Sequence, residues 1–221
     1  MRRALPIVVL AVLVLAGCGG GGSSSSKPDP ALLKPATLTK KAPQLFDVTF
    51  HTTAGDFTLS VHRTWAPHGA DRFYNLVKNH FYDGDKIFRV VPGFVVQFGI
   101  SPFPEVSKAW QTATIPDDTI TVHNERGAVA FASAGPDTRT TQIFIDLGNN
   151  TNLDVDQFAP FAAVTDGMDV VEKLYSGYGD KPTPEQGQMM TQGDAYFDKA
   201  WPKLDEIKTA TISNASNPAL P

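Results

Sequence analysis

The stretch FYDGDKIFRVVPGFVVQFG, residues 81–99, places one permanently charged side chain in a hydrophobic run. Arg89 stands between Phe88 and Val90, and no Asp or Glu lies between residues 86 and 100. A guanidinium is rarely buried without a partner, because removing it from water costs free energy that hydrogen bonds or a counter-charge must offset. Arg89 therefore either lies on the wet face of a strand, with its stem over apolar neighbours, or serves a function at a surface.

Alternating apolar and polar residues around this stretch predict a mainly β domain. The runs with this pattern are 46–53, 57–62, 87–91, 94–98, 127–133, 142–147, 158–164 and 209–213. Apolar residues at helical spacing predict two helices, at 66–79 and 168–179. Many short strands without regular strand–helix alternation favour a closed antiparallel sheet. We therefore predict an eight-stranded antiparallel β-barrel capped by two helices.

The first residues predict export. Two arginines precede the apolar run Ala4–Ala16, which is shorter than the roughly 20 residues that span a bilayer and so indicates a secretory leader. The sequence Leu-Ala-Gly-Cys at 15–18 resembles the bacterial lipobox, where cleavage precedes a lipid-modified cysteine. Cys18 is the only cysteine, so it forms no intramolecular disulfide. We predict a signal peptide at 1–17, lipidation of Cys18 and anchoring to a bacterial membrane; the alternative is an uncleaved leader with an unmodified thiol.

Composition divides the rest of the chain into three parts. Residues 18–43 are rich in Gly, Ser and Pro, which predicts a flexible tether. Residues 44–213 have a globular composition and the length of one domain, and residues 214–221 resemble a disordered tail. Removing the two leader arginines changes the formal net charge from −4 to −6. Because Lys and Arg form no basic stripe, the charge distribution excludes a nucleic-acid-binding surface. We expect the protein to be a monomer.

Several chemistries lack their motifs in this sequence. The five histidines show no H-x-x-x-H spacing and no second thiol exists, so a zinc site is not expected. No G-x-S-x-G, P-loop or G-x-G-x-x-G motif occurs, which leaves acyl transfer, phosphoryl transfer and dinucleotide binding without their usual residues. We expect neither a metal nor a cofactor.

Two long segments resemble one enzyme family. FYDGDKIFRVVPGFVVQFG and GAVAFASAGPDTRTTQIFI, residues 127–145, are similar to the conserved blocks of the cyclophilin-type peptidyl-prolyl cis-trans isomerases. The likeness extends from Phe46 to Ile212. FAPFAAV, MDVVEKLYSGYGD and a C-terminal GDAYFDKAWPKLDEI-type extension resemble a bacterial, exported lipoprotein branch of that family. The resemblance implies the cyclophilin-like barrel and isomerisation of X-Pro peptide bonds.

The resemblance also implies the site residues. The implied catalytic group consists of Arg89, Phe94, Gln97 and Phe144. The implied substrate-binding group consists of Val95, Phe131, Ala132, Ser133, Gln142, Leu153 and Phe158. Ordinary core packing remains an equal alternative for Phe131 and Leu153, and a structural hydrogen bond to its own loop is an alternative for Gln97.

The chain departs from the best-known members at two places in the implied site. Asn152 stands where those members carry a tryptophan, which puts tight cyclosporin binding in doubt. Phe158 follows a one-residue insertion and stands where those members carry a pocket histidine, although Gln157 is an alternative occupant. Arg89 is then the main polar group of the site.

The expected function follows from the resemblance. A fixed guanidinium beside a dry proline pocket stabilises the twisted X-Pro amide, without a nucleophile or proton shuttle. We expect an isomerase that acts on proline-containing peptides and unfolded exported proteins at the cell envelope. The alternative is a chaperone-like binding module with weak or no catalysis. An Arg89 locked in an internal ion pair, facing away from any groove, would contradict the enzymatic interpretation.

Overall fold

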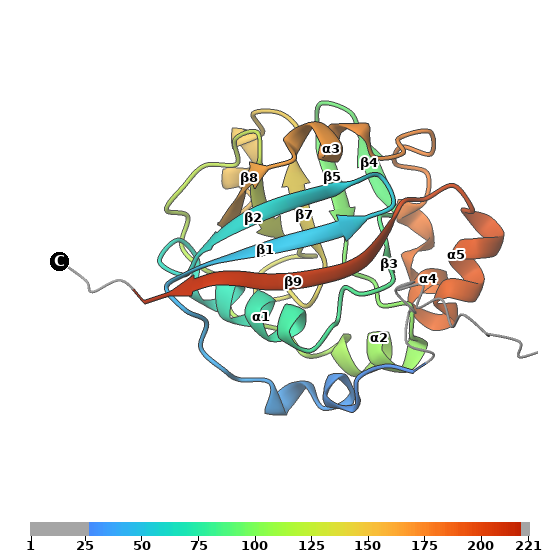
Figure 1. Ribbon diagram of the computed structural model, residues 1–221, viewed down its shortest axis with the longest axis horizontal. Coiled ribbons are helices and arrows are strands. Elements are labelled where there is room, and N and C mark those ends of the chain that lie inside the picture. Colours follow the sequence, from blue (N-terminus) through green and yellow to red (C-terminus); the bar gives the residue numbers. More distant parts are fainter. Residues whose placement is uncertain (1–26, 218–221) are drawn as a thin grey trace, which may run out of the picture.

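One antiparallel sheet of nine strands curls around the hydrophobic core in the computed structural model (Figure 1), which describes residues 27–217. The predicted leader 1–17, Cys18 and the first part of the predicted tether lie outside the described residues, as do residues 218–221. The strand order is β3-β9-β1-β2-β8-β6-β7-β5-β4. The strands are β1 Leu45–Thr52, β2 Asp56–His62, β3 Asp85–Lys86, β4 Arg89–Val91, β5 Val95–Phe98, β6 Ala128–Phe131, β7 Ile143–Asp146, β8 Pro160–Asp166 and β9 Glu206–Ser216.

The predicted closed, eight-stranded barrel is wrong in two respects. A ninth strand, β3, is present, and the sheet ends at β3 and β4 without hydrogen-bonded pairing between them. These edge strands are consecutive in sequence and are separated only by Ile87 and Phe88. Because no ladder joins these two edges, the sheet is a curled half-barrel. Two residues of β3 are also too few to give a periodic pattern.

Five α-helices accompany the sheet within the described residues, where two were predicted. They are α1 Pro67–Lys78, α2 Pro104–Trp110, α3 Met168–Lys173, α4 Gln186–Gln192 and α5 Asp194–Ala200. The helix predicted at 66–79 corresponds to α1. The helix predicted at 168–179 ends at Lys173, because Leu174 is extended with ψ 144°. No helix of residues 27–217 has both the length and the apolar character that crossing a membrane requires.

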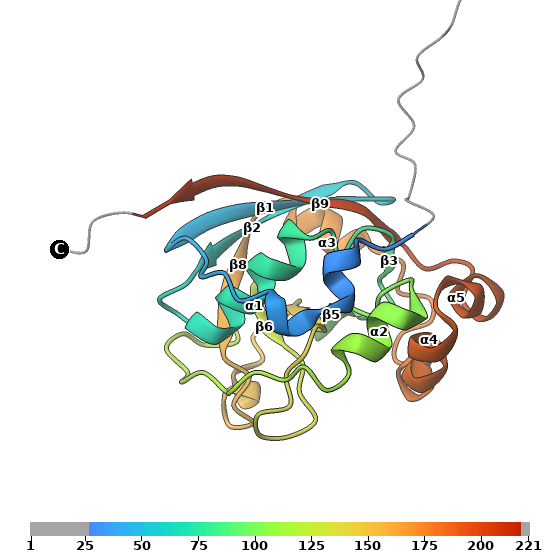
Figure 2. The ribbon, with the colours of Figure 1, turned by 90° about the horizontal axis from the view of Figure 1, so that it is seen from below.

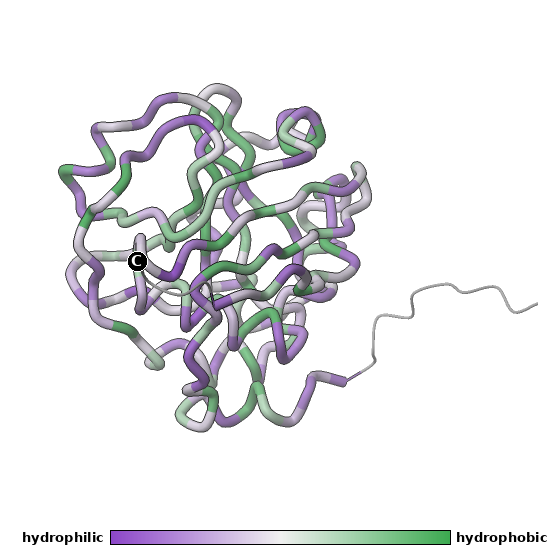
Figure 3. The backbone as a smooth tube through the Cα atoms, turned by 60° about the vertical axis from the view of Figure 1, so that its left-hand side comes forward, coloured by the Kyte–Doolittle hydropathy of each residue, from purple (hydrophilic) through white to green (hydrophobic). Residues whose placement is uncertain are grey.

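Strand alternation builds the core. In β1 the side chains of Phe46, Val48 and Phe50 are buried, and the alternate residues are partly exposed. The β2 residues Phe57 and Leu59 face the same core from the opposite positions of the hairpin. Figure 3 shows hydrophobic residues along the strands in the middle of the molecule and hydrophilic residues along outer loops.

The folded body begins before the predicted boundary at residue 44. Two 3₁₀ turns, Pro30–Leu33 and Pro35–Thr37, lie beside α1 and α2 (Figure 2). Leu32 is only 2% exposed, and its carbonyl accepts a hydrogen bond from Trp110 Nε1 at 2.9 Å. At the other end β9 continues to Ser216, past the predicted start of the tail at 214.

Residues 175–205 between α3 and β9 form a separate unit at one end of the sheet (Figure 1), which we call the α4–α5 segment. It has its own hydrophobic cluster, in which Met189 and Phe197 pack against Phe88 and Ile100 from the body. Phe88 precedes Arg89, so this cluster anchors the segment directly beside the arginine.

Candidate active site

Four neighbouring strands place a row of side chains across one face of the sheet. Arg89 of β4 lies opposite Gln97 of β5, Gln97 lies opposite Phe144 of β7, and Phe144 lies opposite Ala130 of β6. Because side chains alternate along a strand, directly paired residues share a face. The backbone ladders therefore fix a cation, an amide and an aromatic ring side by side.

This row opens into a pocket of about 250 Å³. All predicted site residues except Phe131 and Gln142 line it. The lining residues are Arg89, Phe94, Val95, Gln97, Ala132, Ser133, Phe144, Leu153, Phe158, Thr183 and Gln186. Aromatic and aliphatic side chains dominate one side of the pocket, and polar side chains dominate the other.

Phe131 belongs to the core and not to the pocket. It is fully buried, and its ring lies 5.1 Å from the ring of Phe161. Strand alternation explains the difference: Ala130 packs with Val95 and Phe144 beneath the pocket, so its neighbour Phe131 points to the opposite face. Ala130 was missed, although the period of two along this strand would have indicated it.

Gln142 lies behind the pocket lining and contacts it through Gln97. The Nε2 group of Gln97 donates to Gln142 Oε1 at 2.9 Å. Gln97 Oε1 in turn accepts a hydrogen bond from Arg89 Nη1 at 3.1 Å. The side chain of Gln97 therefore forms hydrogen bonds with both Arg89 and Gln142.

Three contacts orient the guanidinium of Arg89. Nε donates to Asp180 Oδ1 at 2.6 Å, Nη1 donates to Gln97, and the guanidinium carbon lies 5.5 Å from the centre of the Phe94 ring. The ion pair with Asp180 does not turn the arginine away from the groove, because Arg89 lines the pocket. The side chain of Asp180 is 62% exposed against 22% for Arg89, so water reaches this pair from the carboxylate side.

Phe158 lines the pocket, and its alternative Gln157 does not. Gln157 is exposed, with φ 63°. Phe158 then meets Phe144 edge to face, with ring centres 5.5 Å apart. Asn152 is exposed, and Leu153 next to it reaches the pocket. This side of the pocket is thus more apolar than one that contains a histidine.

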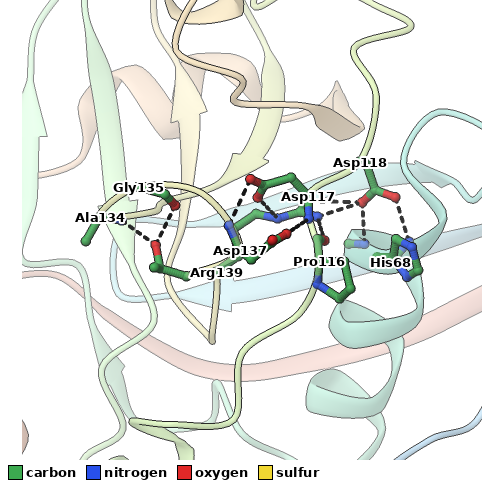
Figure 4. Close-up of polar contacts among 10 residues, drawn as sticks. His68, Pro116, Asp117, Asp118, Ala134, Gly135, Asp137 and Arg139 are labelled. Carbon is green, nitrogen blue, oxygen red and sulfur yellow. Dashed lines mark hydrogen bonds and ion pairs between the residues drawn. The ribbon is translucent and has the colours of Figure 1, made fainter.

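The loop after β6 is anchored by a buried arginine that the sequence analysis missed (Figure 4). Arg139 is 2% exposed, pairs with Asp118 Oδ2 at 3.1 Å and donates to the carbonyl of Pro116. The carboxylate of Asp118 also accepts the backbone N–H groups of His68 and Gly69 at 2.9 Å, at the start of α1. The loop that follows Ala132 and Ser133 is therefore fixed to the body.

A buried carboxyl group lies on the pocket side of β7, two residues after Phe144. Burial raises the pKa of Asp146 to about 7, against the effect of the hydrogen bond from Asn150. Asn150 Nδ2 donates to Asp146 Oδ1 at 2.6 Å and to the carbonyl of Phe94 at 2.8 Å. Asn150 thus links the carboxyl group of Asp146 to the backbone carbonyl of Phe94.

The α4–α5 segment supplies the pocket residues that sequence reasoning did not find. Thr183 and Gln186 line the polar side. Thr183 Oγ1 donates to Asp180 Oδ1 at 3.0 Å, and Gln142 Nε2 donates to Gln186 Oε1 at 2.9 Å. These residues follow the Arg89 motif by about 90 positions, and no local pattern links them to it.

Comparison with known proteins places the chain in a family. Residues 47–193 match the model of the family described as cyclophilin type peptidyl-prolyl cis-trans isomerase/CLD. A peptidyl-prolyl cis-trans isomerase of Acinetobacter baylyi is 33% identical over 132 residues, which cover 58% of this chain and 70% of the relative. Peptidyl-prolyl cis-trans isomerase-like 3 of Mus musculus is 31% identical over 130 residues, which cover 58% and 80% of the two chains.

Solved structures agree on the fold. A crystal structure of a cyclophilin type peptidyl-prolyl cis-trans isomerase of Cryptosporidium parvum superimposes with a TM-score of 0.57 at 19% identity. The match covers 79% of this chain and 99% of the other. A structure of that protein in the presence of the dipeptide Ala-Pro gives a TM-score of 0.58 at 18% identity, and covers 76% and 99% of the two chains. With the family match over more than half of its length, the chain belongs to the cyclophilin type peptidyl-prolyl cis-trans isomerases.

Proposed function

We propose that this protein isomerises X-Pro peptide bonds in exported, unfolded proteins at the cell envelope, where a lipid on Cys18 anchors it to a bacterial membrane. The observation that carries the catalytic part is the position of Arg89, which lines the same pocket as Phe94, Phe144 and Phe158. The positive charge of Arg89 therefore lies at the wall of a largely apolar pocket of about 250 Å³.

The energetic demand on the site is modest. Rotation about an X-Pro amide crosses a barrier of about 18–20 kcal/mol, because the nitrogen lone pair is delocalised into the carbonyl. A ten-thousandfold acceleration requires a reduction of about 5.5 kcal/mol, at roughly 1.36 kcal/mol for each factor of ten. No bond to substrate is formed or broken, so binding the twisted amide more tightly than the planar one is sufficient.

The apolar side of the pocket would hold the proline ring. Phe94, Phe144, Leu153 and Phe158 form this side, and the half-buried Ala132 and Ser133, directly after β6, line the pocket beside them. Enclosing the ring fixes one end of the rotating bond and excludes water, which strengthens the neighbouring electrostatic interactions.

Arg89 would stabilise the transition state. When the amide twists, its nitrogen becomes pyramidal and holds a localised lone pair, which accepts a hydrogen bond better than the planar amide does. A guanidinium fixed in place interacts with this species without reorganising. Its planar group offers several donors, and unlike an ammonium it is weakly hydrated.

The envelope part of the proposal rests on the sequence of residues 1–18. Uncatalysed X-Pro isomerisation takes on the order of 10–100 s, long enough to limit the folding of exported chains. An anchored isomerase would act where these chains emerge.

The catalytic proposal is tested with residues 27–217 and a proline-containing peptide. We expect Arg89→Ala to lower kcat/KM about a hundredfold, the effect of removing one preorganised donor. Equal rates for the wild type and the variant would refute the role of Arg89. Binding of an unfolded protein that persists in both, without catalysis in either, would favour a chaperone-like binding module instead.

The anchoring proposal is tested with the full chain expressed in a bacterial host. We expect mass spectrometry to find an acylated N-terminal cysteine derived from Cys18, and Cys18→Ser to leave the membrane fraction. A native N-terminus at Met1 with a free thiol would contradict anchoring and leave the catalytic proposal unaffected.

A further inference from the structure

We propose that Asp180 and Gln186 of the α4–α5 segment are positioning residues that hold the guanidinium of Arg89 toward the pocket. The inference rests on the proposed catalytic role of Arg89. It adds two residues of the α4–α5 segment, which lies outside the motif at residues 81–99. It is carried by a chain of hydrogen bonds that leaves the α4–α5 segment at one residue and returns to it six residues later.

The chain of bonds runs through five side chains. Asp180 accepts from Arg89 Nε at 2.6 Å, and Arg89 Nη1 donates to Gln97 at 3.1 Å. Gln97 then donates to Gln142, and Gln142 donates to Gln186, each at 2.9 Å. Both ends lie on the α4–α5 segment, and the three middle residues lie on or beside strands of the sheet.

The arginine sets the direction of every bond in this chain. A guanidinium only donates, so the carboxamide oxygen of Gln97 faces Arg89 and its NH₂ group faces away. The same requirement passes to Gln142 and then to Gln186, whose oxygen receives the last bond. Bonds aligned head to tail in this way polarise and strengthen one another.

Further contacts hold in place the α4–α5 segment, in which this series of hydrogen bonds begins and ends. Glu185, next to Gln186, accepts hydrogen bonds at Oε2 from Tyr196 at 2.6 Å and from Trp201 Nε1 at 3.1 Å. The cluster of Met189 and Phe197 with Phe88 fixes the helices behind these contacts. The segment therefore holds Asp180 and Gln186 at defined positions relative to Arg89.

This arrangement determines which donors of Arg89 remain for a peptide. Within residues 27–217 its hydrogen bonds start from Nε and from one N–H of Nη1, which leaves the second N–H of Nη1 and both of Nη2 for the substrate. Asp180 also places a negative charge beside the cation, but its carboxylate is largely solvated and the charge is screened. Orientation of the guanidinium outweighs the loss of positive potential, so removing Asp180 lowers the rate.

The experiment measures bound-state isomerisation of a proline-containing peptide by NMR exchange spectroscopy, together with the Arg89 Nε–H resonance. We expect Asp180→Ala to slow isomerisation about fivefold, the upper end of what an exposed ion pair contributes, with peptide affinity unchanged. Asp180→Asn keeps an acceptor but loses the charge, and we expect an intermediate loss of about twofold. The Arg89 Nε–H signal should exchange faster with water in Asp180→Ala.

Glu172→Ala is the matched control. Glu172 pairs with Arg126 in another exposed arginine–carboxylate contact, away from the pocket lining. We expect it to change neither the rate nor the Arg89 signal. Gln186→Leu, which removes the last acceptor of the chain, should slow isomerisation about twofold.

Equal or faster isomerisation in Asp180→Ala, with the wild type active, would overturn the positioning role and leave the proposed function intact. An inactive wild type would refute the proposed function. In that case the Nε–H signal decides about the contact alone: unchanged exchange in Asp180→Ala would overturn the contact as well.

Discussion

The pocket has two sides that are built in different ways. Its apolar residues and Arg89, which we call the floor, come from neighbouring strands and from the connections beside them, and backbone ladders fix the pairs Arg89–Gln97 and Gln97–Phe144. Its polar rim comes from the α4–α5 segment, which is held by a small cluster of its own. The sheet thus places Arg89. The residues that we propose to orient it belong to the α4–α5 segment, which contributes little to the main core. We therefore expect the rim to unfold locally while the floor stays folded.

The largest effects should come from truncating one aromatic residue in each unit. Phe161 packs between Phe73 and Phe131 in the main core, whereas Phe197 belongs to the cluster of the α4–α5 segment. We expect Phe161→Ala to lower the free energy of unfolding by about 3–5 kcal/mol. Phe197→Ala should mainly accelerate hydrogen exchange within residues 175–205. A uniform increase of exchange over the whole domain in Phe197→Ala would show that the two units unfold together.

The next effect separates floor from rim in activity. Phe144 is 5% exposed and lies beneath the pocket, so Phe144→Ala removes apolar contact worth about 1.5–3 kcal/mol to a bound proline ring. We expect kcat/KM to fall between about 10- and 100-fold. Thr183→Ala at the rim should cost about twofold. Comparable losses in the two variants, measured with one peptide, would mean that the rim binds the ring as much as the floor does.

The sequence predicted the floor well because its residues occupy one contiguous motif and strands that pair directly. Arg89, Phe94 and Val95 lie within seven positions, and the alternation around them defines the face. Phe131 was named as a substrate-binding residue from its position in the motif, with core packing as an equal alternative, and the structure shows core packing. The ninth strand was missed because β3 has only two residues, too few for any pattern.

The rim could not be found in this way. Asp180 contacts Arg89, and Gln186 contacts Gln142, because the α4–α5 segment packs against Phe88 and Ile100 of the body. The seven residues of α4, QGQMMTQ, carry no apolar stripe and no side-chain cap, so local propensity did not indicate a helix. Arg139 was missed for a related reason, because its partners Pro116 and Asp118 belong to a distant loop.

The smaller of the two expected effects on stability concerns Asp146, beside Phe94, and depends on pH. Because burial raises the pKa of Asp146 to about 7, the folded state holds a proton that the unfolded state releases between about pH 4 and 7. This stabilising contribution is complete below pH 4 and is lost as the pH rises through 7. Asp146→Asn is neutral throughout and keeps the oxygen that accepts from Asn150.

We expect Asp146→Asn to raise the free energy of unfolding at pH 8 by about 2 kcal/mol, which is roughly 4–8 °C in Tm for a domain of this size. The gain should shrink toward pH 5. The exposed Asp166→Asn is the control for the change in net charge. A gain that is the same at both pH values would place the cause outside the titration of Asp146.

The proposed catalysis depends on the shape of the Arg89 cation as well as on its charge, and Arg89→Lys tests this most directly. The substitution keeps the positive charge but replaces the planar group that contacts Asp180, Gln97 and Phe94 with a strongly hydrated ammonium. We predict at least a tenfold loss in the rate of cis–trans relaxation of a proline-containing peptide, and no loss in Arg126→Lys at the exposed pair. An Arg89→Lys protein that retains more than half of the wild-type rate would contradict the account.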